Sequence, residues 1–132
     1  MDEHSDTLRV LIADDDADAV GALADLLPLL SLRPLAVIVA LNGQDALHLA
    51  TGLVRPHTVV LDIEMPVLDG FQAAAAIKKA LGAACPLLIA ISGHVGHVEI
   101  AESGGLFDYA LRKPIDPDDL VRLISAADDR SV

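Results

Sequence analysis

The chain has few cysteines and few aromatic residues. Its single cysteine, Cys85, excludes a disulfide framework and a cysteine-based zinc site. Tryptophan is absent, and the aromatic residues are Phe71, Phe107 and Tyr109. The hydrophobic fraction of 53% must therefore come mainly from alanine, leucine, valine and isoleucine. We expect such a core where helices pack on a buried sheet, with Cys85 as a small buried hydrophobic residue.

Basic residues and long hydrophobic runs are also scarce. Nine lysines and arginines oppose 20 acidic residues, which gives a net charge of −11. The basic residues are scattered, whereas binding to nucleic-acid phosphates requires them to cluster, so we expect no direct nucleic-acid partner. No apolar run approaches the roughly 18 residues of a membrane helix, and the acidic N-terminus is unlike a signal peptide. We therefore expect no membrane insertion and a cytoplasmic location.

The length of 132 residues fits one domain, which we place at residues 8–127 with ragged termini at 1–7 and 128–132. Short apolar runs alternate with stretches of helical spacing, as is typical of repeated βα units. The runs are unbroken, which indicates strands buried on both faces of a parallel sheet. The five predicted strands are residues 8–13, 35–40, 58–61, 87–91 and 109–112.

Helices are expected between these strands. The first begins near Asp16, and Pro28 should kink it or end it near Leu27, because proline removes a backbone donor and clashes with the preceding turn. Segment 93–105 contains four glycines, each of which costs about 1 kcal/mol in a helix interior, so its helix should be short or mobile. The remaining helices are predicted at residues 43–52, 71–81 and 117–127.

Polar residues stand where four of the apolar runs end. Asp14 and Asp15 follow the first run, Asp62 ends the third, Ser92 ends the fourth, and Lys113 follows the fifth. In an α/β fold of flavodoxin-like strand order 2-1-3-4-5, these ends meet at one edge of the sheet, where ligands bind. Carboxylates gathered there repel one another, and a hard cation such as Mg²⁺, or Mn²⁺ in its place, would relieve that repulsion.

Each of these residues also has a simpler interpretation. Asp14, Asp15 and Asp16 could cap the first helix, and Asp62 could begin a turn with Asp69 and Gly70. Ser92 could be a strand-end cap, and Lys113 could be a solvated surface charge. All four simpler explanations would have to coincide at the same sheet edge, so we favour a functional site.

This set of residues, in this order, resembles the receiver domain of two-component response regulators, the CheY-like family. The resemblance implies that Asp62 accepts a phosphoryl group from the phosphohistidine of a sensor kinase or a histidine phosphotransfer protein. It also implies that the face around the fourth helix, fifth strand and fifth helix contacts a downstream protein. The metal ligands implied are Asp14, Asp15, Asp62 and the Glu64 backbone carbonyl, and the phosphate-binding or switch residues are Ser92, Gly93 and Lys113. The Lys113–Pro114 bond is a cis candidate on the same basis.

The chain departs from the family pattern at the position three before Lys113. Receivers commonly have an aromatic switch residue there, whereas this chain has Ala110, with Tyr109 one residue earlier and on the opposite face of the strand. We therefore expect signalling by ordering of the fourth helix rather than by an aromatic flip. Glu64 and His94 are further candidate modulators, although His94 and His97 are more simply read as loop histidines without a metal.

Two other functions remain open. The domain could be a phosphorylation-independent binding scaffold, which Ala110 supports. It could also be a Mg²⁺-dependent phosphatase with Asp62 as nucleophile, but such enzymes have a second aspartate where this chain has Glu64, and no cap domain is present. The receiver interpretation implies no turnover of an external substrate. It fits both a single-domain regulator and a module of a longer regulator or hybrid kinase.

Overall fold

The structure is a computed structural model that describes residues 7–130. Its centre is a five-stranded parallel sheet of order β2-β1-β3-β4-β5, which confirms the predicted flavodoxin-like α/β class. Of the ragged ends predicted at 1–7 and 128–132, residues 1–6 and 131–132 lie outside the described residues. The strands are β1 (Leu8–Ala13), β2 (Leu35–Ala40), β3 (Thr58–Asp62), β4 (Leu87–Ser92) and β5 (Tyr109–Arg112).

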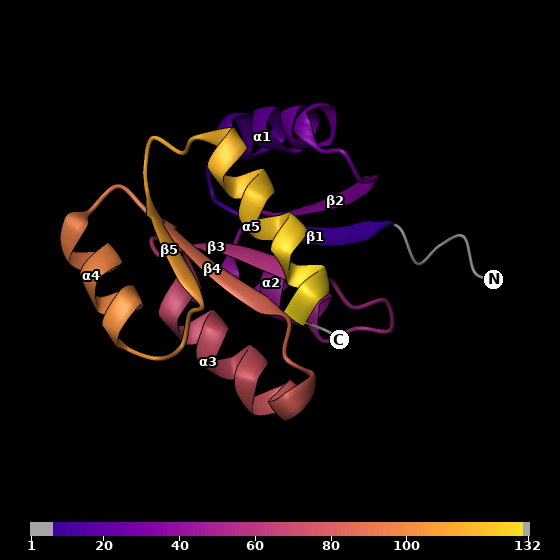
Figure 1. The fold of residues 1–132 in the computed structure, drawn as a ribbon. Coiled ribbons are helices and arrows are strands. Elements are labelled where there is room, and N and C mark those ends of the chain that lie inside the picture. Colours follow the sequence, from indigo (N-terminus) through magenta and orange to yellow (C-terminus); the bar gives the residue numbers. More distant parts are fainter. Residues whose placement is uncertain (1–6, 131–132) are drawn as a thin grey trace.

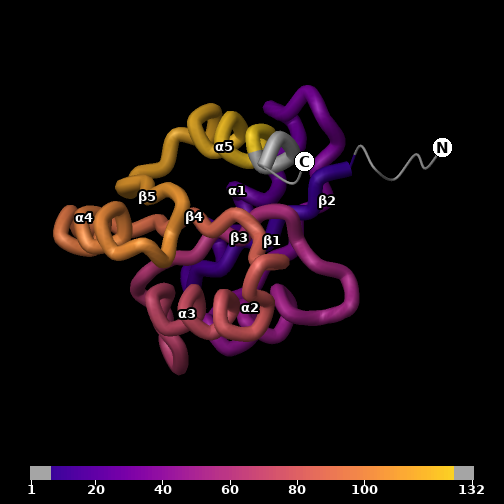
Figure 2. The backbone as a smooth tube through the Cα atoms, turned by 60° about the horizontal axis from the view of Figure 1, so that its bottom comes forward, coloured from indigo at the N-terminus to yellow at the C-terminus, as the bar shows by residue number. Residues whose placement is uncertain are grey.

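Helices cover both faces of the sheet (Figures 1 and 2). One apolar cluster joins β1, β3 and β4 to α1 and α5, and a second joins the opposite face to α2, α3 and α4. Among the described residues, no helix is long and apolar enough to cross a membrane. The helices are α1 (Ala17–Leu30), α2 (Gly43–Ala50), α3 (Gly70–Leu81), α4 (Val95–Ser103) and α5 (Pro117–Arg130), and a short 3₁₀ turn, η2 (Gly82–Ala84), follows α3.

The structure corrects the predicted ends of α1, α2 and α5. Helix α1 does not end near Leu27 but continues past Pro28 to Leu30, because Leu27 is fully buried and packing holds the last turn despite the lost hydrogen bond. Helix α4 is short, as its glycines predicted. Helix α2 is two residues shorter than expected, and α5 extends three residues further.

The expectation that every strand is buried on both faces is wrong for β2 and β5. Strands β3 and β4 are buried along their whole length. Strand β2 alternates between partly buried and exposed residues up to the buried Ala40, and β5 has exposed ends and two partly buried middle residues. Each of these two strands pairs with one neighbour and forms an edge of the sheet. Cys85 is likewise half-buried at the border of the core rather than fully buried.

Side-chain caps fix where the helices begin, and therefore where the strand-end loops lie. Asp16 caps α1 by accepting a hydrogen bond from the Ala19 amide, and Asn42 caps α2 in the same way. Asp69 and Gln72 form a capping box at the start of α3, and Gly82 ends that helix with a positive φ of 53°. Asp16 and Asp69 thus have the structural roles expected of helix-start residues.

Gly70 lets α3 start directly against the end of β3. Its amide donates to the Ile63 carbonyl at 2.9 Å, and a Cβ atom built there would lie 2.5 Å from the Asp62 carbonyl oxygen. Any larger residue must therefore push α3 away from the strand that carries Asp62. The absence of a side chain at this position sets the spacing between helix and strand.

We predict that Gly70→Ala lowers the free energy of unfolding by about 1–3 kcal/mol, the usual cost of overpacking a tight contact. The matched control is Gly21→Ala in α1, where an added Cβ atom meets nothing within 4 Å. That variant should keep or raise stability, because alanine favours helix more than glycine does. Urea unfolding followed by circular dichroism measures both. Equal stability of the Gly70 variant and the wild type would contradict the close approach.

Candidate functional site

The fold brings the predicted strand-end residues to one edge of the sheet. Strands β1 and β3 are neighbours, with Ala13 opposite Leu61, so Asp14 and Asp62 lie next to each other. The Lys113 amide donates to the Ser92 carbonyl at 2.8 Å, which continues the β4–β5 pairing beyond β5. This edge lies where the chain order reverses between β1 and β3, the usual ligand position in such sheets.

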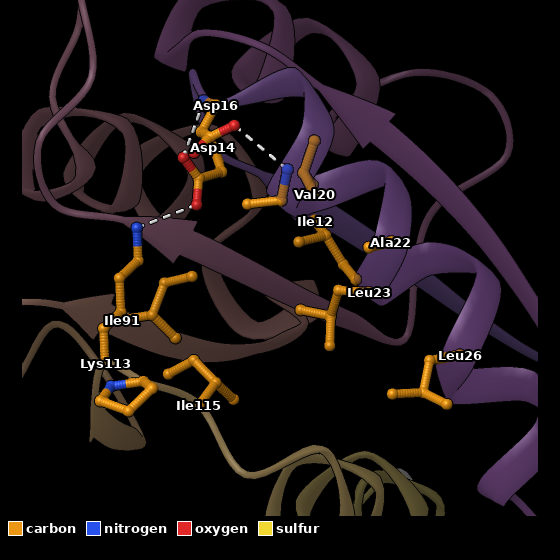
Figure 3. A pocket seen from close by; sticks show the side chains of 12 residues that line it. Ile12, Asp14, Asp16, Val20, Ala22, Leu23, Leu26, Ile91, Lys113 and Ile115 are labelled. Carbon is orange, nitrogen blue, oxygen red and sulfur yellow. Dashed lines mark hydrogen bonds and ion pairs between the residues drawn. The ribbon is translucent and has the colours of Figure 1, made fainter.

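Lys113 joins the two buried carboxylates. Its Nζ atom lies 3.0 Å from Asp14 Oδ2 and 2.9 Å from Asp62 Oδ2. The aspartate side chains are 5% and 6% exposed, whereas that of Lys113 is 34% exposed. Figure 3 shows the lysine reaching from its strand end toward Asp14. The peptide bond after it, Lys113–Pro114, is cis, as the resemblance implied.

Backbone amides orient the other oxygen of each carboxylate. Asp14 Oδ1 accepts from the Asp16 amide at 3.0 Å, and Asp62 Oδ1 accepts from the Glu64 amide at 3.1 Å. Both bonds run to the residue two positions further on, so they are made locally by the loop that follows each strand. The two carboxylates are therefore held before any ligand arrives.

The pKa values of the pair reflect burial and mutual charge. Burial raises the pKa of Asp62 above its ordinary value of 3.8, and the Asp14 charge adds to this, while the Lys113 hydrogen bond opposes it. Partial burial lowers the pKa of Lys113, but the hydrogen bonds and charges of Asp62 and Asp14 prevail and raise it above 10.5. Lysine thus offsets only part of the cost of ionising Asp62.

Asp15 completes a cluster suited to a metal ion. One carboxylate oxygen from each of Asp14, Asp15 and Asp62 lies within 4.8 Å of the others, and Asp15 faces solvent. Three carboxylates against one ammonium leave an excess of negative charge. Oxygen ligands in this number fit a hard divalent cation that keeps some of its waters. The residues present are therefore able to bind a metal.

Ser92 lies at the same edge and is 1% exposed. Its Oγ atom accepts from the His94 amide at 3.1 Å and lies 3.2 Å from His97 Nδ1. Gly93 is exposed, and a Cβ atom there would meet nothing within 4 Å, so it leaves the edge open. The sequence interpretation missed the contact between Ser92 and His97. The two residues are five positions apart, one at the end of a strand and one in the next helix, and no sequence pattern predicts such a contact.

The candidate modulators lie around this edge. Glu64 Oε1 is 2.6 Å from His94 Nε2, and both side chains are more than half exposed. Ala110 packs against the core cluster on the α2–α4 face, whereas Tyr109 is 43% exposed. The two residues therefore face opposite sides of β5, as strand alternation predicted.

Two hollows adjoin the carboxylates. One of about 390 Å³ lies between α1 and the segment after β5, and Figure 3 shows its apolar lining from Val20, Leu23, Leu26 and Ile115. A second of about 390 Å³ is bordered by Asp15, Glu64, Phe71 and His97, among others. The acidic edge is thus open on both sides of the sheet.

We predict that Asp62→Asn stabilises the protein at pH 7.5 by about 1–2 kcal/mol, the order of an imperfectly compensated buried polar group. Because the folded-state pKa of Asp62 is raised, the folded state holds the proton more tightly than the unfolded chain. Stability therefore falls as the pH rises from about 3.8 through the folded pKa. The advantage of the asparagine variant should shrink toward pH 4.

Urea unfolding at several pH values measures this difference. Asp25→Asn, on an exposed position of α1, removes the same formal charge and controls for the net charge of −11. A destabilised Asp62 variant, or an advantage equal to that of the control at every pH, would contradict the raised pKa.

Comparison with known proteins identifies the family. A family model described as the response regulator receiver domain matches residues 10–125. The chain is 32% identical over 127 residues to the protein PilG of Pseudomonas aeruginosa, which covers 96% of this chain and 91% of PilG. It is 44% identical over 78 residues to the transcriptional regulatory protein PrrA of Mycobacterium leprae, which covers 59% of this chain but only 32% of PrrA.

A solved structure leads to the same family. The crystal structure of a response regulator receiver domain protein from Clostridium thermocellum matches with a TM-score of 0.81 and 25% identity, and the match covers 94% of this chain and 96% of that one. The strand-end residues on which the resemblance rested are thus found in a chain whose fold matches that of a receiver domain. Since the family model spans most of the chain, this protein belongs to the response regulator receiver domain family of two-component signalling proteins, which are not conventional enzymes.

Proposed function

We propose that Asp62 accepts a phosphoryl group from a phosphohistidine of a sensor kinase or histidine phosphotransfer protein. The observation that carries this proposal is the buried Asp62 carboxylate, held between the Lys113 ammonium and the acidic cluster at the open edge of the sheet. A carboxylate can act as a nucleophile toward phosphorus when charge on the transferring oxygens is neutralised. No general base is required for such a transfer.

The residues divide the work of the transfer. An Asp62 oxygen forms the new bond to phosphorus while the bond from phosphorus to the partner's imidazole nitrogen breaks, and its electron pair stays on that ring. Lys113 stabilises negative charge on the phosphoryl oxygens from one side. Mg²⁺, or Mn²⁺, bound by Asp14, Asp15, Asp62 and the Glu64 carbonyl would supply positive charge from the other side. We assign Ser92 and the Gly93 segment to binding of a phosphoryl oxygen.

The surroundings support a protein partner on each side of the site. The hollow beside α1 presents apolar side chains next to Lys113, which suits a helix of the phosphohistidine protein. We propose the face of α4, β5 and α5 for a downstream protein, since Val95, Ile100 and Tyr109 expose apolar surface there. The phosphorylated state would then act through contacts between proteins in the cytoplasm, and the domain would not turn over an external substrate.

Ala110 keeps the scaffold function as a second candidate. Without an aromatic residue at this position, a phosphoryl group on Asp62 has no aromatic side chain on this face of β5 to draw inward. A phosphorylation-independent scaffold would keep the fold and the acidic cluster but would not form a phosphorylated state. The two candidates therefore differ in a directly measurable product.

We predict that Asp14→Asn combined with Asp15→Asn abolishes detectable Mg²⁺ binding, because two of the three carboxylates of the cluster lose their charge. Titration followed by amide NMR shifts measures the binding. Asp16→Asn is the matched control, since it lies in the same acidic run but caps α1 and is not in the cluster. Unchanged Mg²⁺ affinity in the double variant would refute the metal assignment.

We predict that acetyl phosphate adds one phosphoryl group to the wild type in the presence of Mg²⁺ and none to Asp62→Asn. Intact mass spectrometry measures the addition directly, and a sample without Mg²⁺ shows the metal dependence. No addition to the wild type would favour the scaffold function. Rapid turnover of a generic phosphate ester would favour a phosphatase instead.

A further inference from the structure

His97 holds the hydroxyl group of the buried Ser92. The Ser92 Oγ atom lies 3.2 Å from His97 Nδ1 and also accepts from the His94 amide at 3.1 Å. A serine hydroxyl has one proton to donate, and a backbone amide cannot accept it. Where the His97 ring carries its proton on Nε2, Nδ1 is the acceptor for the hydroxyl proton. Both contacts of the hydroxyl are thus with residues at the start of α4.

Aromatic contacts fix the position of the His97 ring. Its edge meets Phe71 at a centroid distance of 6.3 Å, and Phe71 in turn meets Phe107 at 6.0 Å. Phe107 is buried in the core cluster. The ring thus lies between the start of α3 and the first turn of α4, with Nδ1 presented to Ser92. Glu64 Oε1 is further from this nitrogen, at 3.9 Å.

Few other interactions hold the first turn of α4. Its N-cap residue, His94, makes no capping hydrogen bond with its side chain, and Ala101 is the buried residue of the helix among those described. The pair of His94 with Glu64 is exposed on both sides, and exposed ion pairs contribute little to stability. The bond from His97 to a fully buried hydroxyl is therefore a principal tie between this turn and the sheet.

We propose that His97 and a phosphoryl group on Asp62 compete for the Ser92 hydroxyl, so that phosphorylation releases His97 and the first turn of α4. This inference rests on the proposed function. A charged phosphoryl oxygen is a stronger acceptor than a neutral imidazole. The Ser92 hydroxyl therefore donates its hydrogen bond to the phosphoryl group instead of to His97. His97 thereby takes the role of the aromatic switch residue, which this chain lacks because position 110 is an alanine.

The direction of the change differs from the sequence-based expectation. That expectation was that phosphorylation orders α4, whereas loss of the Ser92 contact loosens its first turn. The released ring also changes its contact with Phe71, which carries the effect to α3. The face proposed for the downstream partner includes α4, so the change occurs where the partner would bind.

The first test follows the His97 ring itself. In protein labelled with ¹⁵N-histidine, long-range NMR correlations report the hydrogen bonding of Nδ1, and the spectrum of His97→Gln assigns the ring. Addition of Mg²⁺ and beryllofluoride, a phosphoryl mimic, should shift the Nδ1 resonance in the wild type but not in Asp62→Asn. Amide hydrogen exchange over residues 94–98 should become faster under the same conditions.

The second test compares variants of His97. His97→Phe keeps a ring against Phe71 but removes the acceptor, so it should bind beryllofluoride about two- to tenfold more tightly, the value of one hydrogen bond. His97→Asn places an oxygen near the position of Nδ1 and should restore the wild-type affinity. In a Ser92→Ala background, His97→Phe should have no effect, because the contested hydroxyl is absent.

The outcomes separate this inference from the proposed function. If the wild type binds the mimic with Asp62 dependence but its Nδ1 resonance and the variant affinities do not change, the competition is wrong and the phosphoacceptor stands. If the wild type does not bind the mimic, both are wrong. Tighter binding by His97→Phe that persists without the Ser92 hydroxyl would also overturn the competition.

Discussion

Repulsion between buried carboxylates is the constraint on which the rest of the site depends. Asp14 and Asp62 must lie together at the strand ends, and burial makes their ionised forms costly. The Lys113 ammonium relieves that cost, although Lys113 follows Asp14 by 99 residues and Asp62 by 51 residues in the chain. It can do so because β1, β3 and β5 end at the same edge. The charge balance of the site therefore depends on the order of the strands.

The packing around this edge serves the same requirement. Small residues such as Gly70, Ala73 and Ala74 let α3 lie directly against the sheet, and local hydrogen bonds from the loop amides orient both carboxylates. The net charge of the cluster stays negative, which leaves the site able to bind a metal cation. Holding these charges together at one edge costs the fold some stability.

The sequence interpretation succeeded where local patterns carry the information and failed where neighbours decide. Continuous apolar runs located every strand, and the residues predicted at the strand ends do meet at one edge of the sheet. The same runs overstated the burial of β2 and β5, because the residues cannot show which strands lie at the edges. Pro28 was expected to kink α1 or end it near Leu27, and the early end does not occur because burial of Leu27 outweighs the missing hydrogen bond. Each failure reflects a contact made after the elements assemble.

The sequence by itself determined the βα alternation, the caps of the helices and the identity of the groups at the strand ends. These features depend on neighbouring residues and on the side-chain period, which is two residues in a strand and 3.6 residues in a helix. Only the tertiary structure decided that Lys113 bridges both carboxylates, and that His97 rather than an aromatic residue of β5 meets Ser92. Those contacts depend on the packing of α4 and β5 against the sheet, and local periodicity does not encode distances between separate elements.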